Sequence, residues 1–425
     1  MRSRLEAVVG DHSIYTARRK EFDTGQKIPF RVSSVPLELS SSQTREVGTI
    51  GRDTASYLLA VDALYRTDER VRAILDTGKP EIFLTDDSRP SQYLSIRPDL
   101  IITPKGFSLC EIETSPFGLA LAEVLNRGYR QEGFETLVGD NVLSEHVQAQ
   151  TPIEGTIVYS TKTQSYAGQM TFLADEVFSG EGRNWQALHA SDMRGETRPD
   201  IYRGFYLAES LTDPDVESLL HRQMTNGGVL LPSPTPHMEE KANLALIWDK
   251  RFEEYFKREL GEGAFNHLRE VIPPTWVVGY EEFFAPGMPH GISTSVDLAT
   301  LSQAKRAFVV KPSGFGTNTS WAEGVKFLHK QSAANASAIL QGAAQDRSGL
   351  HVIQEFRPGV KVPMYYEKDG QQIPMQAKIR LTPYYSLAPG QEGTLVAIKA
   401  TGCENTDFLH ASSVSINTAV TGAEG

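Results

Sequence analysis

Apolar and polar positions alternate most clearly along two short runs, 96–103 and 107–114. The runs flank the turn sequence Pro-Lys-Gly at 104–106. Proline presets φ for a turn and glycine supplies a positive φ, so the pattern predicts a β-hairpin with a three-residue loop. Such a loop pairs Thr103 with Phe107.

Counting outward from this loop places Asp99 opposite Glu111 and Arg97 opposite Glu113. Directly paired residues share a face of a sheet, so these four charged side chains are predicted to lie together. A slip of one residue would divide them between the two faces, so the prediction depends on the register. The opposite, buried face is predicted to carry Leu100, Ile102, Cys110 and Ile112.

A patch of three carboxylates and one guanidinium has two interpretations. The first is a solvated face on which an Arg97–Glu113 cross-strand pair contributes about 0.2–1 kcal/mol. The second is a magnesium site, because hard divalent cations bind carboxylate oxygens and Mg²⁺ completes its shell with water and phosphate. The hairpin alone leaves both open.

The hydrophobic pattern elsewhere predicts an α/β (α+β) chain. Helical spacing covers 52–67, 118–130 (ending near Gly128) and 237–260, and 68–76 extends the first helix or begins another. The stretch 1–50 is polar and poorly periodic, and its three serines at 40–42 are predicted to form a loop. The segment 414–425 is small and polar and is predicted to fray at its end.

From about residue 151 strands and helices alternate, which predicts a small parallel α/β layer. The expected strands are 155–160, 185–189, 201–203 and 228–231, and the expected helices are 165–178 and 215–224. Further along the chain, the pattern predicts strands at 307–311, 350–356, 361–367, 376–381 and 393–400, with a helix at 333–344.

Composition narrows the function classes. The chain has 425 residues and a net charge of −11, which argues against a nucleic-acid backbone as the main partner. Two cysteines provide neither a zinc spacing nor a disulfide framework, so we expect a reducing cytoplasm. No apolar run reaches about 18 residues, which argues against a membrane partner. Oligomeric state is not predicted.

A second chemical cluster begins where the apolar strand 307–311 ends in Lys311 and enters the loop 312–318. A lysine beside a loop rich in backbone donors suits a polyphosphate, since the ammonium is a point charge and the N–H groups form an anion nest. The loop is neither a Walker A sequence nor a dinucleotide fingerprint. The alternative is a glycine-containing turn beside a surface lysine. The candidate phosphate-binding residues are Lys311, Ser313, Gly314 and Gly316.

The strand 350–356 ends in Gln354, Glu355 and Phe356. Its main-chain groups could meet an adenine edge with Phe356 against the ring, or it could be an edge strand with an exposed Glu355. Along 376–381, Arg380 lies on a basic face that either meets phosphate or is solvated.

Together these segments resemble the ATP-grasp superfamily, in particular its circularly permuted branch, which includes glutathionylspermidine synthetase. Arg97, Asp99 and Glu111 match by identity and spacing that family's arginine, metal aspartate and metal glutamate. Position 113 departs from the pattern, because the family typically has Asn there, and the family's loop arginine is missing. The carboxylates precede Lys311 here, which is the permuted order.

The resemblance implies an ATP-grasp fold in permuted order with an inserted parallel α/β layer. The hairpin belongs to 1–150, a pre-ATP-grasp-like substrate region to 151–290, and the lysine, glycine loop and adenine hinge to 291–425. It further implies metal ligands, a catalytic arginine and nucleotide-binding residues. These are Asp99, Glu111 and Glu113 for Mg²⁺, Arg97 for catalysis, and Lys311, Ser313, Gly314, Gly316, Gln354, Glu355, Phe356 and Arg380 for ATP.

The implied activity is an ADP-forming carboxylate–amine ligase that joins a small-molecule or peptide carboxylate to an amine through an acyl phosphate. Positioning and electrostatics carry such phosphoryl transfer. Two alternatives stay open: a phosphotransferase on the same scaffold, and a catalytically silent nucleotide-binding protein.

Overall fold

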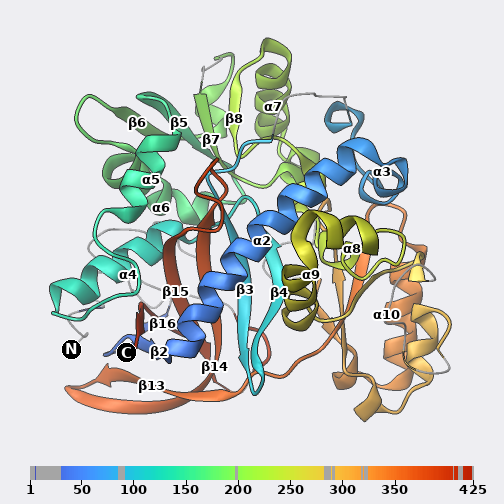
Figure 1. Ribbon diagram of the computed structural model, residues 1–425. Helices are drawn as coiled ribbons and strands as arrows, with labels where there is room; N and C mark the ends of the chain where they lie inside the picture. Colours follow the sequence, from blue (N-terminus) through green and yellow to red (C-terminus); the bar gives the residue numbers. More distant parts are fainter. Residues whose placement is uncertain are drawn as a thin grey trace.

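The computed structural model shows a mixed α/β chain, in agreement with the predicted class, and the residues that it describes form four sheets (Figure 1). None of its described helices has the length and apolar character needed to cross a bilayer. The structure describes Leu5 and residues 30–84, 91–196, 200–281, 289, 292–316, 319, 324–404, 406–409 and 415–423.

The predicted hairpin forms strands β3 (Ser95–Thr103) and β4 (Gly106–Glu113), which pair in antiparallel fashion. Its turn is one residue tighter than expected, because Thr103 pairs with Gly106 rather than with Phe107. The register then shifts by one between Asp99 and Leu100.

This shift is a β-bulge that compensates for the tighter turn. Asp99 therefore faces Glu111 and Arg97 faces Glu113, as predicted. The expected core face needs one correction. Cys110, the extra residue of the bulge, lines a cavity, and Leu109 takes the fully buried position opposite Leu100.

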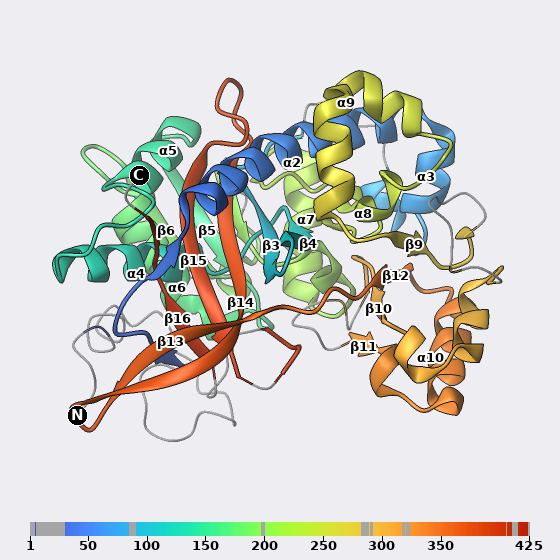
Figure 2. The same ribbon diagram turned by 60° about the horizontal axis from the view of Figure 1, so that its bottom comes forward.

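The hairpin forms one edge of a seven-stranded sheet. The other strands come from residues 31–32 and from the C-terminal part of the chain. The strand order is β1-β16-β15-β14-β3-β4, and β13 pairs with β14 outside this path. Figure 2 shows β13 and β14 as a long twisted ribbon. The further strands are β1 (Arg31–Val32), β13 (Lys361–Lys368), β14 (Gln371–Ser386), β15 (Leu395–Cys403) and β16 (Ser415–Thr418).

The segment 415–422, for which the sequence predicts no strand, pairs with the body of the protein, and the fraying predicted for the end of the chain concerns residues 424 and 425, which lie outside the described residues. Strand β16 lies between β15 and β1, and β17 (Val420–Gly422) pairs in parallel with β2 (Leu37–Leu39). Ile416 and Val420 are fully buried. Asn417 Oδ1 accepts a hydrogen bond from the Thr401 hydroxyl at 2.7 Å, so this polar side chain is anchored inside the protein through its oxygen.

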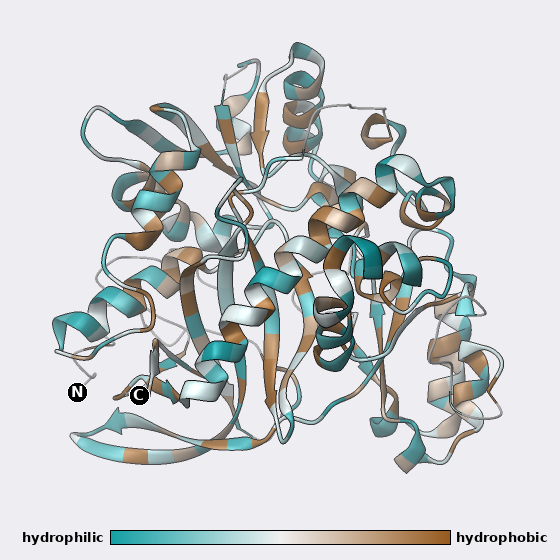
Figure 3. Ribbon diagram, viewed as in Figure 1, coloured by the Kyte–Doolittle hydropathy of each residue, from teal (hydrophilic) through white to brown (hydrophobic). Residues whose placement is uncertain are grey.

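Helix α2 (Ser41–Thr67) crosses in front of this sheet, and brown apolar turns alternate with teal polar ones along it (Figure 3). The three serines are not a loop. Ser40 caps the helix and forms a capping box with Gln43, so helix begins where loop was predicted. Helix α3 (Glu69–Leu75) follows as a separate element with Asp68 as its N-cap.

The parallel layer is confirmed, with strand order β6-β5-β7-β8 and all neighbours parallel. The predicted helix 165–178 is a 3₁₀ turn followed by α6 and a π-helical segment, Leu173–Phe178. The strands and helices of this layer are β5 (Glu154–Tyr159), β6 (Asn184–His189), β7 (Asp200–Gly204), β8 (Val229–Leu231), α5 (Val142–Gln150), α6 (Ala167–Phe172) and α7 (Pro214–Asn226).

A smaller antiparallel sheet carries Lys311 and lies apart from the parallel layer, beside α10 (Figure 2). Its order is β11-β10-β12-β9. The strands are β9 (Thr275–Val277), β10 (Phe308–Pro312), β11 (Lys326–Phe327) and β12 (His351–Glu355), and the helix is α10 (Ala333–Gln345).

The predicted helix 237–260 is wrong. The chain instead forms a 3₁₀ turn (Pro236–Glu239), the short α8 (Asn243–Leu246) and, after a turn, α9 (Glu253–Val271). Asp249 explains the interruption, because its buried carboxylate accepts from the Arg251 N–H at 2.8 Å and so favours a turn over a continuous helix. Helix α4 (Leu119–Gln131) also runs past Gly128.

Candidate functional site

One cavity of about 890 Å³ lies between the hairpin, the lysine-bearing sheet and the segments after β5 and β7 that carry Tyr166 and Tyr206. Segments more than two hundred residues apart in the sequence line it together. Ten of the twelve predicted site residues belong to its lining, and Ser313 and Gly316 do not. The ten are Arg97, Asp99, Glu111, Glu113, Lys311, Gly314, Gln354, Glu355, Phe356 and Arg380.

Asp99 is held between two guanidinium groups on neighbouring strands. Arg97 Nε lies 2.9 Å from one carboxylate oxygen, and an Arg380 nitrogen lies 3.0 Å from the other. Although burial opposes ionisation, the charges of Arg380 and Arg97 hold the pKa of Asp99 below its usual range. Both oxygens of Asp99 are therefore engaged within the protein.

Glu113 has one engaged and one unengaged oxygen. Its Oε1 lies 2.5 Å from Arg97, whereas Oε2 is buried without a hydrogen-bond partner among the described residues. Burial, only partly offset by Arg97 and reinforced by Asp99 and Glu111, raises the pKa of Glu113 to about 7. Glu113 thus forms the predicted cross-strand pair and also carries an oxygen that lacks a donor or a cation.

The pKa of Glu113 gives the protein a measurable pH dependence. Between about pH 4.5 and 7 the folded state holds a proton that the unfolded chain has released, so the free energy of unfolding falls as pH rises through this window. The decrease in the urea midpoint from pH 5.0 to pH 7.5 should therefore be smaller in Glu113→Gln than in wild type. Equal declines would contradict the assigned pKa.

Glu111 pairs with a lysine to which the sequence analysis assigned no role. Lys241 Nζ lies 2.9 Å from Glu111 Oε1 and also donates to the main-chain oxygens of Ser313 and Thr319. Burial disfavours the ammonium, but Glu111 outweighs it, and the pKa of Lys241 is raised. Its only sequence signal was its place next to Glu240 before an apolar segment.

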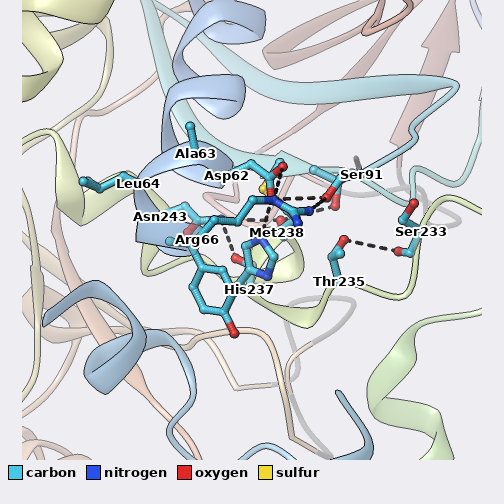
Figure 4. Close-up of polar contacts among 12 residues, drawn as sticks. Asp62, Ala63, Leu64, Arg66, Ser91, Ser233, Thr235, His237, Met238 and Asn243 are labelled. Carbon is cyan, nitrogen blue, oxygen red and sulfur yellow. Dashed lines mark hydrogen bonds and ion pairs between the residues drawn. The ribbon is translucent and has the colours of Figure 1, made fainter. Parts of the chain in front are cut away.

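A buried polar network fixes the turn that delivers Lys241 to the cavity. Figure 4 shows Asp62 and Arg66 of α2 directed toward His237 and Ser91. His237 Nε2 lies 2.7 Å from Asp62, and an Arg66 nitrogen donates to Ser91 Oγ at 2.8 Å. These contacts hold the start of the 3₁₀ turn against α2.

Lys311 lies where the two predicted clusters meet. Its Nζ donates to the Cys110 carbonyl of the hairpin at 2.9 Å and to Gln354 Oε1 at 2.8 Å. Both partners are neutral, and no carboxylate pairs with this lysine within the described part of the chain. Its positive charge is consequently left for an anion in the cavity.

The glycine loop is anchored beneath the cavity rather than spread over it. Ser313 Oγ and the Phe315 N–H both donate to the buried carboxylate of Glu240. A Cβ on Gly314 would lie 2.3 Å from the Glu239 carbonyl, so only glycine fits this close approach. Gly316 does not line the cavity. Thr317 and Asn318 lie outside the described residues.

The end of the cavity near Phe356 is aromatic. The Phe356 ring stacks on His329 at 4.7 Å and meets Phe327 edge-on at 5.4 Å. The N–H groups of Glu355 and Phe356 donate to the carbonyls of Pro274 and Ala307, so neither N–H is available to an adenine edge in this arrangement. A flat ligand at this end of the cavity would pack against an apolar ring face.

The structure also brings Lys399 of β15 into the cavity lining, which the sequence analysis missed. Its side chain is buried at 5% exposure, and Nζ donates to Thr401 Oγ1 at 3.3 Å. Burial, together with the charges of Arg380 and Arg97, lowers the pKa of Lys399 to about 7. The sequence signal for Lys399 was the presence of a lysine inside an otherwise apolar strand. Burying its charge costs free energy, so such a lysine is expected to have a role.

The donor set fits a magnesium ion only in part. Within the described ranges no three carboxylate, imidazole or thiolate side chains converge as a ready metal site. Asp99 is saturated by two arginines, whereas Glu113 Oε2 is a buried oxygen without a partner and Glu111 is partly exposed. The residues therefore fit a cation held by Glu111 and Glu113 and do not fit Asp99 as a direct ligand.

Comparison with known proteins rests on structure, because no family model and no curated protein sequence matches the chain. The fold is similar to that of a glutathione synthetase-like effector (GSS30) from Globodera pallida, with a TM-score of 0.56 and 10% identity. That match covers 98% of this chain and 94% of the other. At this identity the match shows a shared fold and nothing further.

Two weaker likenesses carry no argument of their own. A putative γ-glutamylcysteine synthetase from Methylobacillus flagellatus has a TM-score of 0.44 and 12% identity, over 89% of this chain and 87% of the other. A D-alanine–D-alanine ligase from Bacillus anthracis in complex with ATP has a TM-score of 0.26 and 11% identity, over 61% and 84%.

Proposed function

We propose that this chain is an ADP-forming carboxylate–amine ligase of the permuted ATP-grasp type. The observation that supports it most is the contact of Lys311 with the Cys110 carbonyl, because it joins the phosphate-type lysine to the carboxylate hairpin across one cavity. The fold likeness to a glutathione synthetase-like protein agrees with this proposal.

In this proposal ATP lies along the cavity from its aromatic end to the hairpin. Phe356 packs against the adenine ring, with Gln354 and Glu355 beside it, and Lys311 binds the phosphates. Ser313, Gly314 and Gly316 shape the loop below them. Arg380 and Lys241 contribute further positive charge at the hairpin. Such preorganised cations stabilise transferring phosphoryl groups because they cost little reorganisation when charge develops.

Glu111 and Glu113 are the residues that would hold Mg²⁺, which when bound supplies charge neutralisation at the phosphates. Asp99 would act through Arg97 and Arg380, which it orients by two ion pairs. Arg97 lies beside both acids, where its planar guanidinium suits the acyl phosphate that forms before an amine attacks. The acid is a small-molecule or peptide carboxylate.

Two further expectations belong to this proposal. The hairpin, substrate and lysine-bearing parts divide the chain near residues 150 and 290. Cys110 and Cys403 form no disulfide in the described part of the chain, which suits the reducing cytoplasm that we expect.

The test is an ADP-release screen of paired acids and amines with Mg²⁺, read together with the mass of the condensed product. Wild type should release ADP only with both substrates, and Glu111→Gln should reduce the rate at least tenfold while its circular dichroism spectrum stays that of the folded protein. ADP release without an amine, with a stable phosphorylated product, would instead identify a phosphotransferase. Thermal stabilisation by Mg²⁺–ATP without turnover would identify a silent binding protein.

A further inference from the structure

The start of helix α4 contributes Gly118 and Leu121 to the cavity lining. Gly118 is its N-cap with φ +86°, and the 13-residue helix has neither a side-chain cap nor an acidic residue in its first turn. Leu119, Ala120 and Leu121 are almost fully buried. The first N–H groups of a helix lack intrahelical acceptors and carry partial positive charge, so a buried, uncapped N-terminus favours an anion.

Lys399 meets this helix terminus directly. A Cβ on Gly118 would lie 3.4 Å from Lys399 Cε, so the N-cap packs on the lysine side chain. The ammonium is nine-tenths buried in the cavity lining, and within the described ranges it has the Thr401 hydroxyl as hydrogen-bond partner but no carboxylate within ion-pair distance. A buried charge of this kind is costly unless a counter-ion accompanies it.

The surrounding charges also leave room for one more negative group. Arg97, Arg380 and Lys399 face the carboxylates of Asp99 and Glu113, so three cations meet two acids. Burial, together with the charges of Arg380 and Arg97, lowers the pKa of Lys399. An anion beside Lys399 would restore the balance.

We propose that Lys399 and the uncapped N-terminus of α4 form a binding subsite for a carboxylate of the acid substrate. This proposal deepens the proposed function and rests on it for the identity of the substrate. Two carboxylate oxygens can accept from one ammonium and from the N–H groups of the first helical turn.

The walls of this subsite favour a carboxylate over a phosphate. Phe117 contacts Tyr166 and Tyr206 with ring centroids 5.1 Å from each, and Leu121 completes the lining. The carbon chain of an organic carboxylate can pack on these ring faces, whereas phosphate has no apolar part to bury there. Lys311 is separately placed to bind phosphate.

The test measures binding without ATP or Mg²⁺, so that it does not depend on turnover. Calorimetry and thermal shift would compare glutarate, its neutral isostere glutaramide, and inorganic phosphate as probes. Wild type should bind glutarate and not glutaramide. Lys399→Met should raise the glutarate Kd at least tenfold, whereas Lys257→Met, at an exposed ion pair on α9, should leave it unchanged.

Three results would overturn the subsite. They are equal glutarate affinity in wild type and Lys399→Met, equal binding of glutarate and glutaramide to wild type, and phosphate binding that depends on Lys399 while glutarate binding does not. The second comparison uses wild type only, so it holds even if the variant folds poorly. ADP release in the acid–amine screen with no glutarate binding would reject the subsite and keep the ligase.

Discussion

Lys311→Met is expected to weaken ATP binding about 10- to 100-fold. A hydrogen bond to a charged group contributes about 1.5–3 kcal/mol, and each 1.4 kcal/mol is tenfold in affinity. Lys311 has neutral partners, Cys110 O and Gln354 Oε1, so its charge is not already neutralised by a described carboxylate. Methionine keeps the length of the side chain and removes only the ammonium. The measurement is calorimetric titration with ATP in the presence of Mg²⁺.

Lys305→Met is the matched control, since Lys305 is exposed in the short 3₁₀ turn just before β10. Its ATP affinity should equal that of wild type. Unchanged ATP affinity in Lys311→Met, with an unaltered circular dichroism spectrum, would remove this lysine from the nucleotide site and with it the main support for the ligase proposal.

Lys79→Met is expected to lower the free energy of unfolding by about 3–5 kcal/mol. Lys79 Nζ lies 2.8 Å from Glu240 Oε1, and the two side chains are 0% and 1% exposed. Removing the lysine leaves a carboxylate buried without its counter-ion. Glu240 also accepts from Ser313 and Phe315, so the loss should loosen the glycine loop as well. Urea unfolding measures the first effect and ATP titration the second.

The double variant Lys79→Met with Glu240→Gln separates charge from packing. It removes both charges and retains an amide oxygen that can accept from the Phe315 N–H, so it should recover most of the stability lost in the single variant. Lys257→Met breaks an exposed pair and should cost less than about 1 kcal/mol. A loss that small in Lys79→Met would show that the buried pair contributes no more than a surface one.

For the hairpin, the sequence predicted the pairing of the charged residues correctly and the length of the turn incorrectly. Strand alternation predicted that Arg97, Asp99, Glu111 and Glu113 share one face, and the pairing is as predicted. The turn was nevertheless predicted one residue too long, and the bulge at Cys110 restored the register. Bulges arise from packing on neighbouring strands, which a local pattern does not contain.

Short-range signals predicted elements well and their ends poorly. The parallel layer formed as expected because its apolar runs are separated by clear turn residues. The prediction of a helix over 237–260 was wrong because the buried Asp249 carboxylate accepts from the Arg251 N–H and favours a turn, and this burial is not visible in the local pattern. The capping role of Ser40 was visible only once its capping box with Gln43 was recognised.

The sequence by itself determined the mixed α/β class, the charged hairpin face and the lysine that ends an apolar strand, because strand periodicity and residue chemistry are local properties. Only the tertiary structure decided what those groups do to one another. It saturated Asp99 with two arginines, left Glu113 Oε2 without a partner and brought Lys399 to the start of α4. Burial and charge pairing depend on segments far apart in the chain, so no local pattern specifies them.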